Sequence, residues 1–284
     1  MIDTKHDWTP DFLSACPKLF APITSVAALL TAAHRTHWPT LTDYQTLLDH
    51  YGQAPHTASG AAIRFVAQGA RPSSLADHYE PRIFLRGEVQ TRTDNWHDLF
   101  QVLIWTLFPQ TKLILNALHY HAAHQRHQID LANTRRTPLE NALTLFDECG
   151  AMILSSDPAL LQLIRDFRWK ELFWHRRRDV QTQLRCIVFG HALYEKALTP
   201  YPGMTAQALL FDVDEQRITA PIDEQIALSD ALARQFLDDR QHTLTPRRLQ
   251  PFPLLGMPGW TVDNHEASYY DDTRHFRPGR TLKP

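Results

Sequence analysis

The chain has 284 residues, of which 43% are hydrophobic and 21% charged, proportions ordinary for a soluble globular protein with a sizeable core. Its net charge of −2 gives no overall attraction to nucleic acid or anionic lipid, so we expect neither as a partner. The cysteines Cys16, Cys149 and Cys186 form no CxxC pair and fit a reducing compartment better than a disulfide framework. The most apolar run, 99–108, is too short to span a bilayer, and the first residues lack the pattern of a signal peptide. We therefore expect a cytoplasmic protein without a membrane span.

Two helices between proline-rich connections are predicted in the N-terminal part of the chain. The first covers 24–35, and the second follows a start at Thr40 and stops at Gly52. Further along, the β-branched and aromatic residues of 63–68 and 79–92 predict a small hairpin or an extended flap.

From residue 94 to residue 198 the pattern is helical, and most of the predicted starts coincide with a capping side chain or a proline. The predicted helices in this region run from a cap at Asp94 to about residue 107, over 110–127, from Pro138 to a stop at Gly150, from Asp157-Pro158 to about residue 175, and over 179–198. A further helix is predicted beyond this region, over 223–238.

The C-terminal residues are rich in proline and glycine but include Trp260, Tyr269, Tyr270 and Phe276, whose rings need burial. We expect an extended tail that wraps the domain, with Trp260 and Phe276 as its anchors. No repeat and no clear linker divides the chain, so the expected fold class is mainly α, with a single helical domain over 1–284. Its parts would be N-terminal helices over 1–60, a core over 61–250 with a small β-hairpin or extended region near 63–92, and the tail over 251–284.

Ionisable and amide side chains interrupt these apolar helices at helical spacing. The polar stripes are Lys112, Asn116 and His119; Asn141, Thr144 and Glu148; His191 and Glu195; and His97 and Gln101. Residues three, four or seven apart share one face of a helix, and a buried charge is costly unless it is paired, hydrogen-bonded or bound to metal. We therefore expect the stripes to face one another, with His97 and His191 on neighbouring helices that face a common cavity with Glu148 and Lys112.

Two kinds of chemistry fit such a polar centre, and both would act on a small polar, anionic or phosphorylated ligand. In metal-free acid-base catalysis, His97, His191 or Glu148 would move protons while Lys112 holds an anion. In metal-assisted hydrolysis, a divalent Zn, Fe or Mn ion would be the cofactor. The candidate metal ligands are His97, Asp147, His191 and Glu195, which Asp98 or Glu148 could complete. The candidate catalytic residues are His97, Asp98, Lys112, Asn116, Glu148 and His191.

The same polar groups also fit a non-catalytic binding or adaptor protein, in which they form a buried structural network. A basic run at 174–185, WHRRRDVQTQLR, favours a solvated helix face over a contact with RNA, because the chain as a whole is not basic. No GxGxxG, GxxxxGK[ST], GxSxG or HExxH motif occurs, which weakens the dinucleotide, P-loop, hydrolase-elbow and zinc-protease hypotheses.

Several long blocks carry a resemblance to one family. They are YEPRIFLRGEVQTRTDNWHDLFQVLIWTLFPQTKLILNALH, ALTLFDECG, FGHALYEK, and LLGMPGW followed by YYDD and FRP. In this order, from about residue 60 to about residue 280, the chain resembles the bacterial family catalogued as domain of unknown function 3025. The resemblance implies no particular activity, cofactor or catalytic residue.

Overall fold

The computed structural model describes residues 7–51, 54–129 and 135–279. The first half of the chain forms α1 (Pro17–Phe20), α2 (Thr24–Ala33), α3 (Leu41–His50), β1 (Arg64–Ala67), α4 (Tyr79–Arg86), β2 (Glu88–Thr91), α5 (Trp96–Leu107), α6 (Pro109–Ile129) and α7 (Pro138–Cys149). The second half forms β3 (Gly150–Ser155), α8 (Pro158–Arg165), α9 (Arg177–Gln183), β4 (Leu184–Val188), α10 (His191–Ala197), β5 (Thr205–Asp212), α11 (Glu215–Thr219), α12 (Ile222–Arg240) and β6 (Gln250–Pro253).

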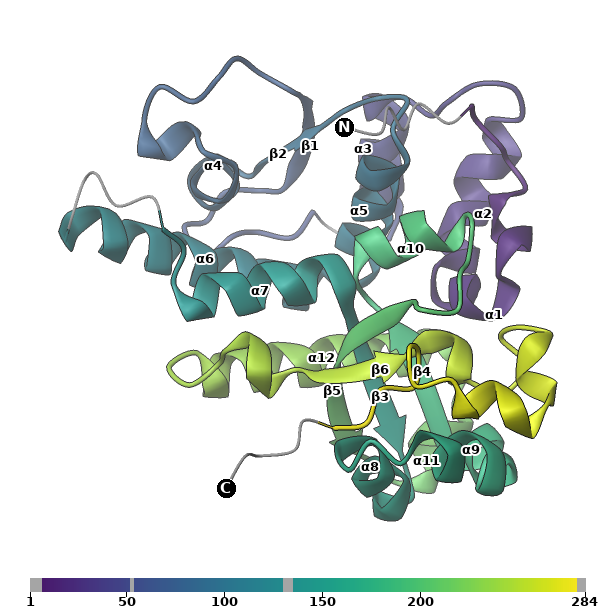
Figure 1. The fold of residues 1–284 in the computed structure, drawn as a ribbon. Coiled ribbons are helices and arrows are strands. Elements are labelled where there is room, and N and C mark those ends of the chain that lie inside the picture. The colour runs from purple at the N-terminus through teal and green to yellow at the C-terminus, as the bar shows by residue number, and fades with distance from the viewer. Residues whose placement is uncertain (1–6, 52–53, 130–134, 280–284) are drawn as a thin grey trace.

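A four-stranded mixed sheet with the order β4-β3-β5-β6 organises the second half of the chain. β3 pairs with β4 antiparallel and with β5 parallel, and β6 adds antiparallel to β5. Figure 1 shows α8, α9 and α11 at one end of this sheet and α5, α6, α7 and α10 toward the other. The second group of helices contains the polar stripes.

The expected mainly α fold class is wrong, because the protein is mixed α/β, with 58% helix, 12% strand and two sheets. The central strand β3 explains the error: all six of its residues are buried. A strand buried on both faces is a continuous apolar run without the alternation that marks a half-exposed strand. Such a run cannot be distinguished by periodicity from a buried helical segment.

The helix predicted over 179–198 is wrong in its middle. Here α9 ends at Gln183, β4 follows at once, and α10 begins only at His191. The β-branched Ile187 and Val188 pair with β3, and pairing of this kind overrides the weak helix preference of the neighbouring residues. The break between β4 and α10 is what brings His191 to the start of a helix.

The hairpin predicted near 63–92 is also wrong, since β1 and β2 pair in parallel. Parallel neighbours need a crossover connection, and α4 lies in that connection, within residues predicted to be extended. Gly87 ends α4 in the left-handed conformation, with φ +70°. A Cβ at this position would lie 1.9 Å from the Ala62 carbonyl oxygen, so only glycine fits this turn.

Capping residues and prolines predicted several helix starts correctly. Thr40 and Thr137 form capping boxes at the starts of α3 and α7, Pro109 begins α6, and Asp157 caps α8. The cap of α5 is Asn95 rather than Asp94, because the Asn95 side chain accepts the hydrogen bond from the Asp98 amide. The helix predicted from Asp157 to about residue 175 is interrupted, because α8 ends at Arg165 and a π-helical segment follows only at Glu171–His175. The predicted stop at Gly52 lies outside the described residues.

The C-terminal segment is more regular than an extended tail. It begins with β6, which joins the sheet, and continues through short helical turns. Phe276 is buried and Trp260 half-buried, and the Trp169 indole donates a hydrogen bond to the Arg277 carbonyl. Residues 280–284 of the predicted tail lie outside the described part of the chain.

Within that described part, no helix is both long and apolar enough to cross a membrane.

Candidate functional site

A cleft of about 940 Å³ opens beside the helices that carry the polar stripes. Its lining comes from the connection before α4, from α4 itself, from the start of α5, and from α6, α7 and the first residue of α10. The lining residues used below are Arg71, His78, Tyr79, Glu80, Arg92, His97, Asp98, Gln101, His119, Arg126, His127, Arg136, Glu140, Thr144, Asp147, Glu148 and His191.

Two imidazoles from distant parts of the sequence meet in this cleft. The Nε2 atoms of His97 and His191 lie 3.1 Å apart, with the rings nearly perpendicular. His97 is in the first turn of α5 and His191 is the first residue of α10. Glu148, in the last turn of α7, places its Oε2 3.7 Å from the His191 Nε2.

Close backbone packing between two glycines positions His191 beside Glu148. The amides of Phe189 and Gly190 both donate to the Gly150 carbonyl. A Cβ on Gly190 would lie 2.5 Å from the Glu148 carbonyl oxygen and from the Gly150 nitrogen. Position 190 must therefore be a glycine, which has no side chain, for β4 to lead into α10 this close to α7.

A carboxylate lies behind the His97 ring. The Nδ1 atom of His97 is 2.9 Å from Oε2 of Glu195, a residue one turn along α10 from His191. Burial works to lower the pKa of His97, but the hydrogen bond with Glu195 and the charge of Glu148 outweigh it and leave the pKa raised. The hydrogen bond with His97 in turn lowers the pKa of Glu195. Glu195 therefore stays ionised and favours a proton on Nδ1, which leaves Nε2 directed at His191.

His191 is almost fully buried, and burial lowers its pKa to about 3. The imidazole is therefore neutral near neutral pH and keeps a lone pair for a proton or a metal ion. Its Nδ1 has no hydrogen-bond partner among the described residues, although Asp147 Oδ2 lies 3.9 Å away. A carboxylate thus stands behind each of the two rings.

Glu148 completes a group able to hold a metal ion. His97, His191 and Glu148 each offer one ligand atom, and these atoms lie within 4.8 Å of one another. Burial raises the pKa of the Glu148 carboxyl, and the charges of His97 and Lys112 oppose the rise without cancelling it. A divalent ion at this position would favour the ionised carboxylate.

Lys112 and Asp147 form a buried ion pair next to this group, with Nζ and Oδ1 2.6 Å apart. Burial works to raise the pKa of Asp147, but the charge and the hydrogen bond of Lys112 oppose it, and the pKa stays below its ordinary value. The Lys112 ammonium also lies 5.2 Å from the centre of the Trp105 ring, a favourable distance for a cation over an aromatic face. The pair fixes Asp147 in its place behind His191.

The candidate catalytic residues Asp98 and Asn116 are bound to other residues of the cleft. Arg92 holds Asp98 with two guanidinium contacts of 3.0 and 2.9 Å. The Asn116 amide donates to a carboxylate oxygen and to the backbone carbonyl of Glu80. These four contacts give Asp98 and Asn116 roles in holding the walls of the cleft.

The structure places some residues of the predicted polar stripes at the cleft and others outside it. His119 and Thr144 line the cleft, whereas Asn141 is exposed. The spacing gave no indication of Arg92 or Glu80, because each contacts its partner across a turn or between elements rather than along one helix face. Gln101 donates a short hydrogen bond of 2.5 Å to the Tyr79 hydroxyl, a contact between α5 and α4 that spacing also does not reveal.

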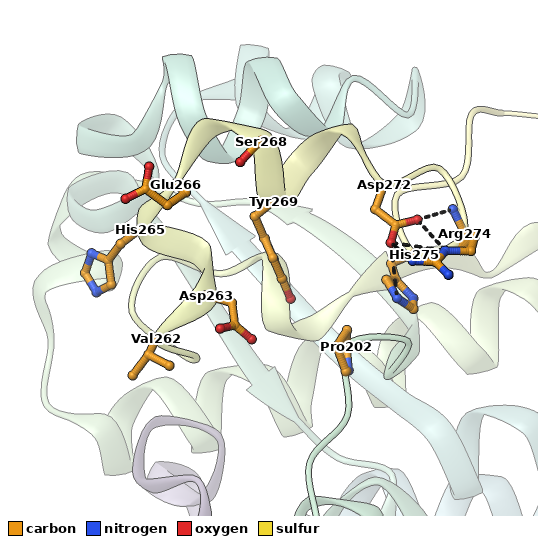
Figure 2. Close-up of a pocket in the computed structure, with 10 residues that line it drawn as sticks. All are labelled: Pro202, Val262, Asp263, His265, Glu266, Ser268, Tyr269, Asp272, Arg274 and His275. Carbon is orange, nitrogen blue, oxygen red and sulfur yellow. Dashed lines mark hydrogen bonds and ion pairs between the residues drawn. The ribbon is translucent and has the colours of Figure 1, made fainter.

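A second hollow, of about 620 Å³, lies on the C-terminal segment and shares no lining residue with the first cleft. Figure 2 shows Arg274 and His275 directed at Asp272, so these charges are paired with one another. The hollow contains no group of histidine and carboxylate atoms close enough to hold a metal ion, as far as the described residues go. We therefore take the first cleft as the candidate site.

Comparison with known proteins gives a family but no activity. No curated protein and no solved structure matches the chain. The model of one family, described as a protein of unknown function (DUF3025), matches residues 63–280. That span includes the residues of the cleft named above, and it covers well over half of the chain. The chain therefore belongs to the DUF3025 family of proteins of unknown function.

Proposed function

We propose that this protein is a metal-dependent hydrolase whose divalent ion is held by His97, His191 and Glu148 and whose substrate is a small polar molecule. The observation that carries the proposal is the approach of the two imidazole Nε2 atoms to 3.1 Å, with Glu148 Oε2 3.7 Å from one of them. Ligand atoms about 2.0 to 2.1 Å from a tetrahedral zinc ion lie about 3.3 Å from each other. The observed distances are close to that value.

The groups behind the two rings support the same assignment. Imidazoles that bind metal through one nitrogen usually donate a hydrogen bond from the other to a carboxylate or carbonyl. Glu195 occupies that place behind His97, at 2.9 Å. Asp147 stands behind His191 at 3.9 Å, near enough for a small ring rotation to form the hydrogen bond. We therefore assign Glu148 as a ligand, and Glu195 and Asp147 as groups that orient the ligands.

The number of protein ligands favours catalysis over a structural ion. Structural zinc sites are closed by four protein ligands, whereas catalytic sites use three and keep one position for water or substrate. Two histidines and one glutamate are such a set, and all three line the cleft. An ion there would make a bound water more acidic and polarise the substrate. Hydrolysis would then add the hydroxyl of water to the substrate and its proton to the leaving group.

Metal-free acid-base catalysis is a second candidate, favoured by the hydrogen bond between His97 and Glu195 and by the raised pKa of His97. In that case Glu195 would orient His97 as the base, and Glu148, with its raised pKa, would be the acid. The two candidates differ in one measurable property, which is whether the site binds a metal ion.

Metal binding to the full-length protein tests the proposal. After chelation and dialysis, the protein is titrated with Zn²⁺ and with Co²⁺, whose absorption spectrum reports tetrahedral coordination. We expect one ion per chain, lost in His97→Ala and His191→Ala. The matched control is His78→Ala, because His78 lines the same cleft but is exposed and outside the ligand group. Circular dichroism and the melting temperature establish that each variant is folded.

Two results would contradict the metal-dependent hydrolase. One is the absence of stoichiometric binding at micromolar Zn²⁺, and the other is equal binding by the wild type and a folded His97→Ala, His191→Ala double variant. If metal is absent but an ester-hydrolysis screen shows activity that depends on His97, acid-base catalysis is favoured. If both are absent, the polar groups form a structural network of a binding protein.

A further inference from the structure

We infer that the cleft selects a phosphomonoester, whose terminal oxygens are bound by Arg71 and Arg136 together with the metal ion. This inference rests on the proposed function and adds the substrate class. It starts from the ionisable residues that line the cleft, which include four arginines and five acidic residues. The arginines are Arg71, Arg92, Arg126 and Arg136, and the acids are Glu80, Asp98, Glu140, Asp147 and Glu148.

Most of these charges neutralise one another inside the protein. Asp98 is held by Arg92, and Asp147 by the buried Lys112. Arg126 lies 3.0 Å from Glu140, whose carboxylate also accepts the hydrogen bond of the Thr137 capping box. Carboxylates held in this way are not available to repel an anionic ligand.

Two acids remain, and each has another partner. Glu80 accepts a hydrogen bond of 2.7 Å from the Asn116 amide. Glu148 belongs to the proposed ligand group, where the ion would neutralise it. The Asn116 amide is neutral, so Glu80 keeps its negative charge and is, among the described residues of the cleft, the acid that no cation offsets.

Two cations of the cleft remain as well, Arg71 and Arg136. Among the described residues, Arg71 and Arg136 have no carboxylate within ion-pair distance, and both are exposed at the cleft. The Arg136 guanidinium donates a hydrogen bond of 3.2 Å to a neutral partner, the Thr144 hydroxyl. Two guanidinium groups and one divalent ion give the cleft an excess of positive charge, which attracts an anion.

The amount of this charge favours phosphate over carboxylate. A carboxylate has one charge and two oxygens, which an ion and one guanidinium would already satisfy. The dianion of a phosphomonoester has three terminal oxygens, enough for the ion and for both guanidinium groups. The side chains of His119 and His127, which also line the cleft, can donate further hydrogen bonds.

The shape of the cleft favours a small molecule. Its volume of about 940 Å³ is within the range of sites that enclose small ligands, and the net charge of −2 does not favour a nucleic acid.

In the reaction, the oxygen of water forms a bond to phosphorus and the bond from phosphorus to the ester oxygen breaks. That oxygen takes the proton, so the products are an alcohol and inorganic phosphate.

Binding of inorganic phosphate to the zinc-loaded protein tests the inference, by calorimetry and with acetate as the comparison anion. We expect saturable binding of phosphate, at least about tenfold tighter than that of acetate. An Arg71→Ala, Arg136→Ala double variant should bind phosphate at least about tenfold more weakly, with unchanged affinity for Zn²⁺. The control is Arg35→Ala, because Arg35 is exposed and outside the cleft.

The zinc titration separates the failure of this inference from the failure of the proposed function. If Zn²⁺ binds as expected but phosphate binds no tighter than acetate, the phosphomonoester is wrong and the metal site stands. The same conclusion follows if the double variant binds phosphate as tightly as the wild type, since the anion would then contact the ion alone. If Zn²⁺ does not bind, the proposed function fails. If, in addition, the metal-free protein binds no phosphate, or binds it equally well in the double variant, the anion site fails too.

Discussion

The interactions that stabilise the cleft differ from those that stabilise the C-terminal segment. Around the cleft, buried side chains meet in specific polar pairs, such as Lys112 with Asp147. Beneath the C-terminal segment an aromatic cluster dominates, in which Phe173 lies at the centre of four rings. These four are Trp169, Phe252, Tyr270 and Phe276.

The difference separates stability from function. Burial of aromatic rings is non-directional and contributes in proportion to the apolar area removed from water. Polar pairs contribute little net stability, but they fix atoms at defined positions and are costly to break. We therefore expect changes in the aromatic cluster to reduce stability without altering ligand binding, and selected changes around the cleft to do the reverse.

The largest expected effect is that of Phe173→Ala in the aromatic cluster. Phe173 is fully buried, and its removal leaves a cavity that the four surrounding rings cannot fill. The free energy of unfolding should fall by about 3 to 5 kcal/mol, measured by chemical denaturation. The affinity for Zn²⁺ under native conditions should not change. A loss of Zn²⁺ binding by the folded variant would show that the two regions are coupled.

Lys112→Met should lower the free energy of unfolding by a similar or slightly smaller amount, about 3 kcal/mol or more. The reason is specific to the cleft, because the variant leaves the Asp147 carboxylate buried without its cation. Chemical denaturation of the metal-free protein gives the value. The control is the double variant Lys112→Met, Asp147→Leu, which removes both charges and should recover most of the stability. If the double variant is less stable than Lys112→Met, the ion pair is not the source of the loss.

Glu195→Gln sharpens the comparison from the opposite side, since it should affect binding more than stability. The amide keeps the shape of the side chain but no longer holds the His97 ring as strongly. Loss of a carboxylate behind a ligating histidine typically weakens metal affinity about 10- to 100-fold. We expect this loss in a Zn²⁺ competition titration, with little change in the melting temperature of the metal-free protein. An unchanged Zn²⁺ affinity would contradict the role proposed for Glu195.

The two regions also differ in how well the sequence predicted them. Helix starts at Thr40, Pro109 and Pro138 follow from local capping chemistry, which needs no knowledge of the rest of the fold. The strands β3 and β4 do not, because a short apolar run becomes a strand only when a partner strand lies beside it. The partner of β3 in the parallel direction, β5, is about fifty residues further along the chain.

Prediction of the site had the same limit. Helical spacing placed His191 and Glu195 on one face, and the cost of burying charge predicted that His97 would be found near them. Spacing placed Glu148 with Asn141 and Thr144 on one face of its helix, but it could not show which of the neighbours Asp147 and Glu148 would approach His191 as the candidate ligand. That choice depends on the direction of the last turn of α7 and on the close approach of Gly190. Three of the cleft arginines, Arg71, Arg92 and Arg136, come from connections, where no periodic pattern exists to align them.

The smallest expected effect is confined to acid pH and concerns Asp147. In the unfolded chain its pKa has the ordinary value of 3.8, and in the folded protein it is lower, because the charge and the hydrogen bond of Lys112 oppose the effect of burial. A group whose pKa is lower in the folded state stabilises the protein above the unfolded pKa, and this contribution is lost as the pH falls through the folded value. Denaturation of the metal-free wild type should therefore show a decline below about pH 4 that is less steep in Lys112→Met, Asp147→Leu. Equal steepness in the two proteins would show that the ion pair is not what keeps Asp147 charged, and the polar pairs of the cleft would then differ less from the aromatic cluster than their geometry implies.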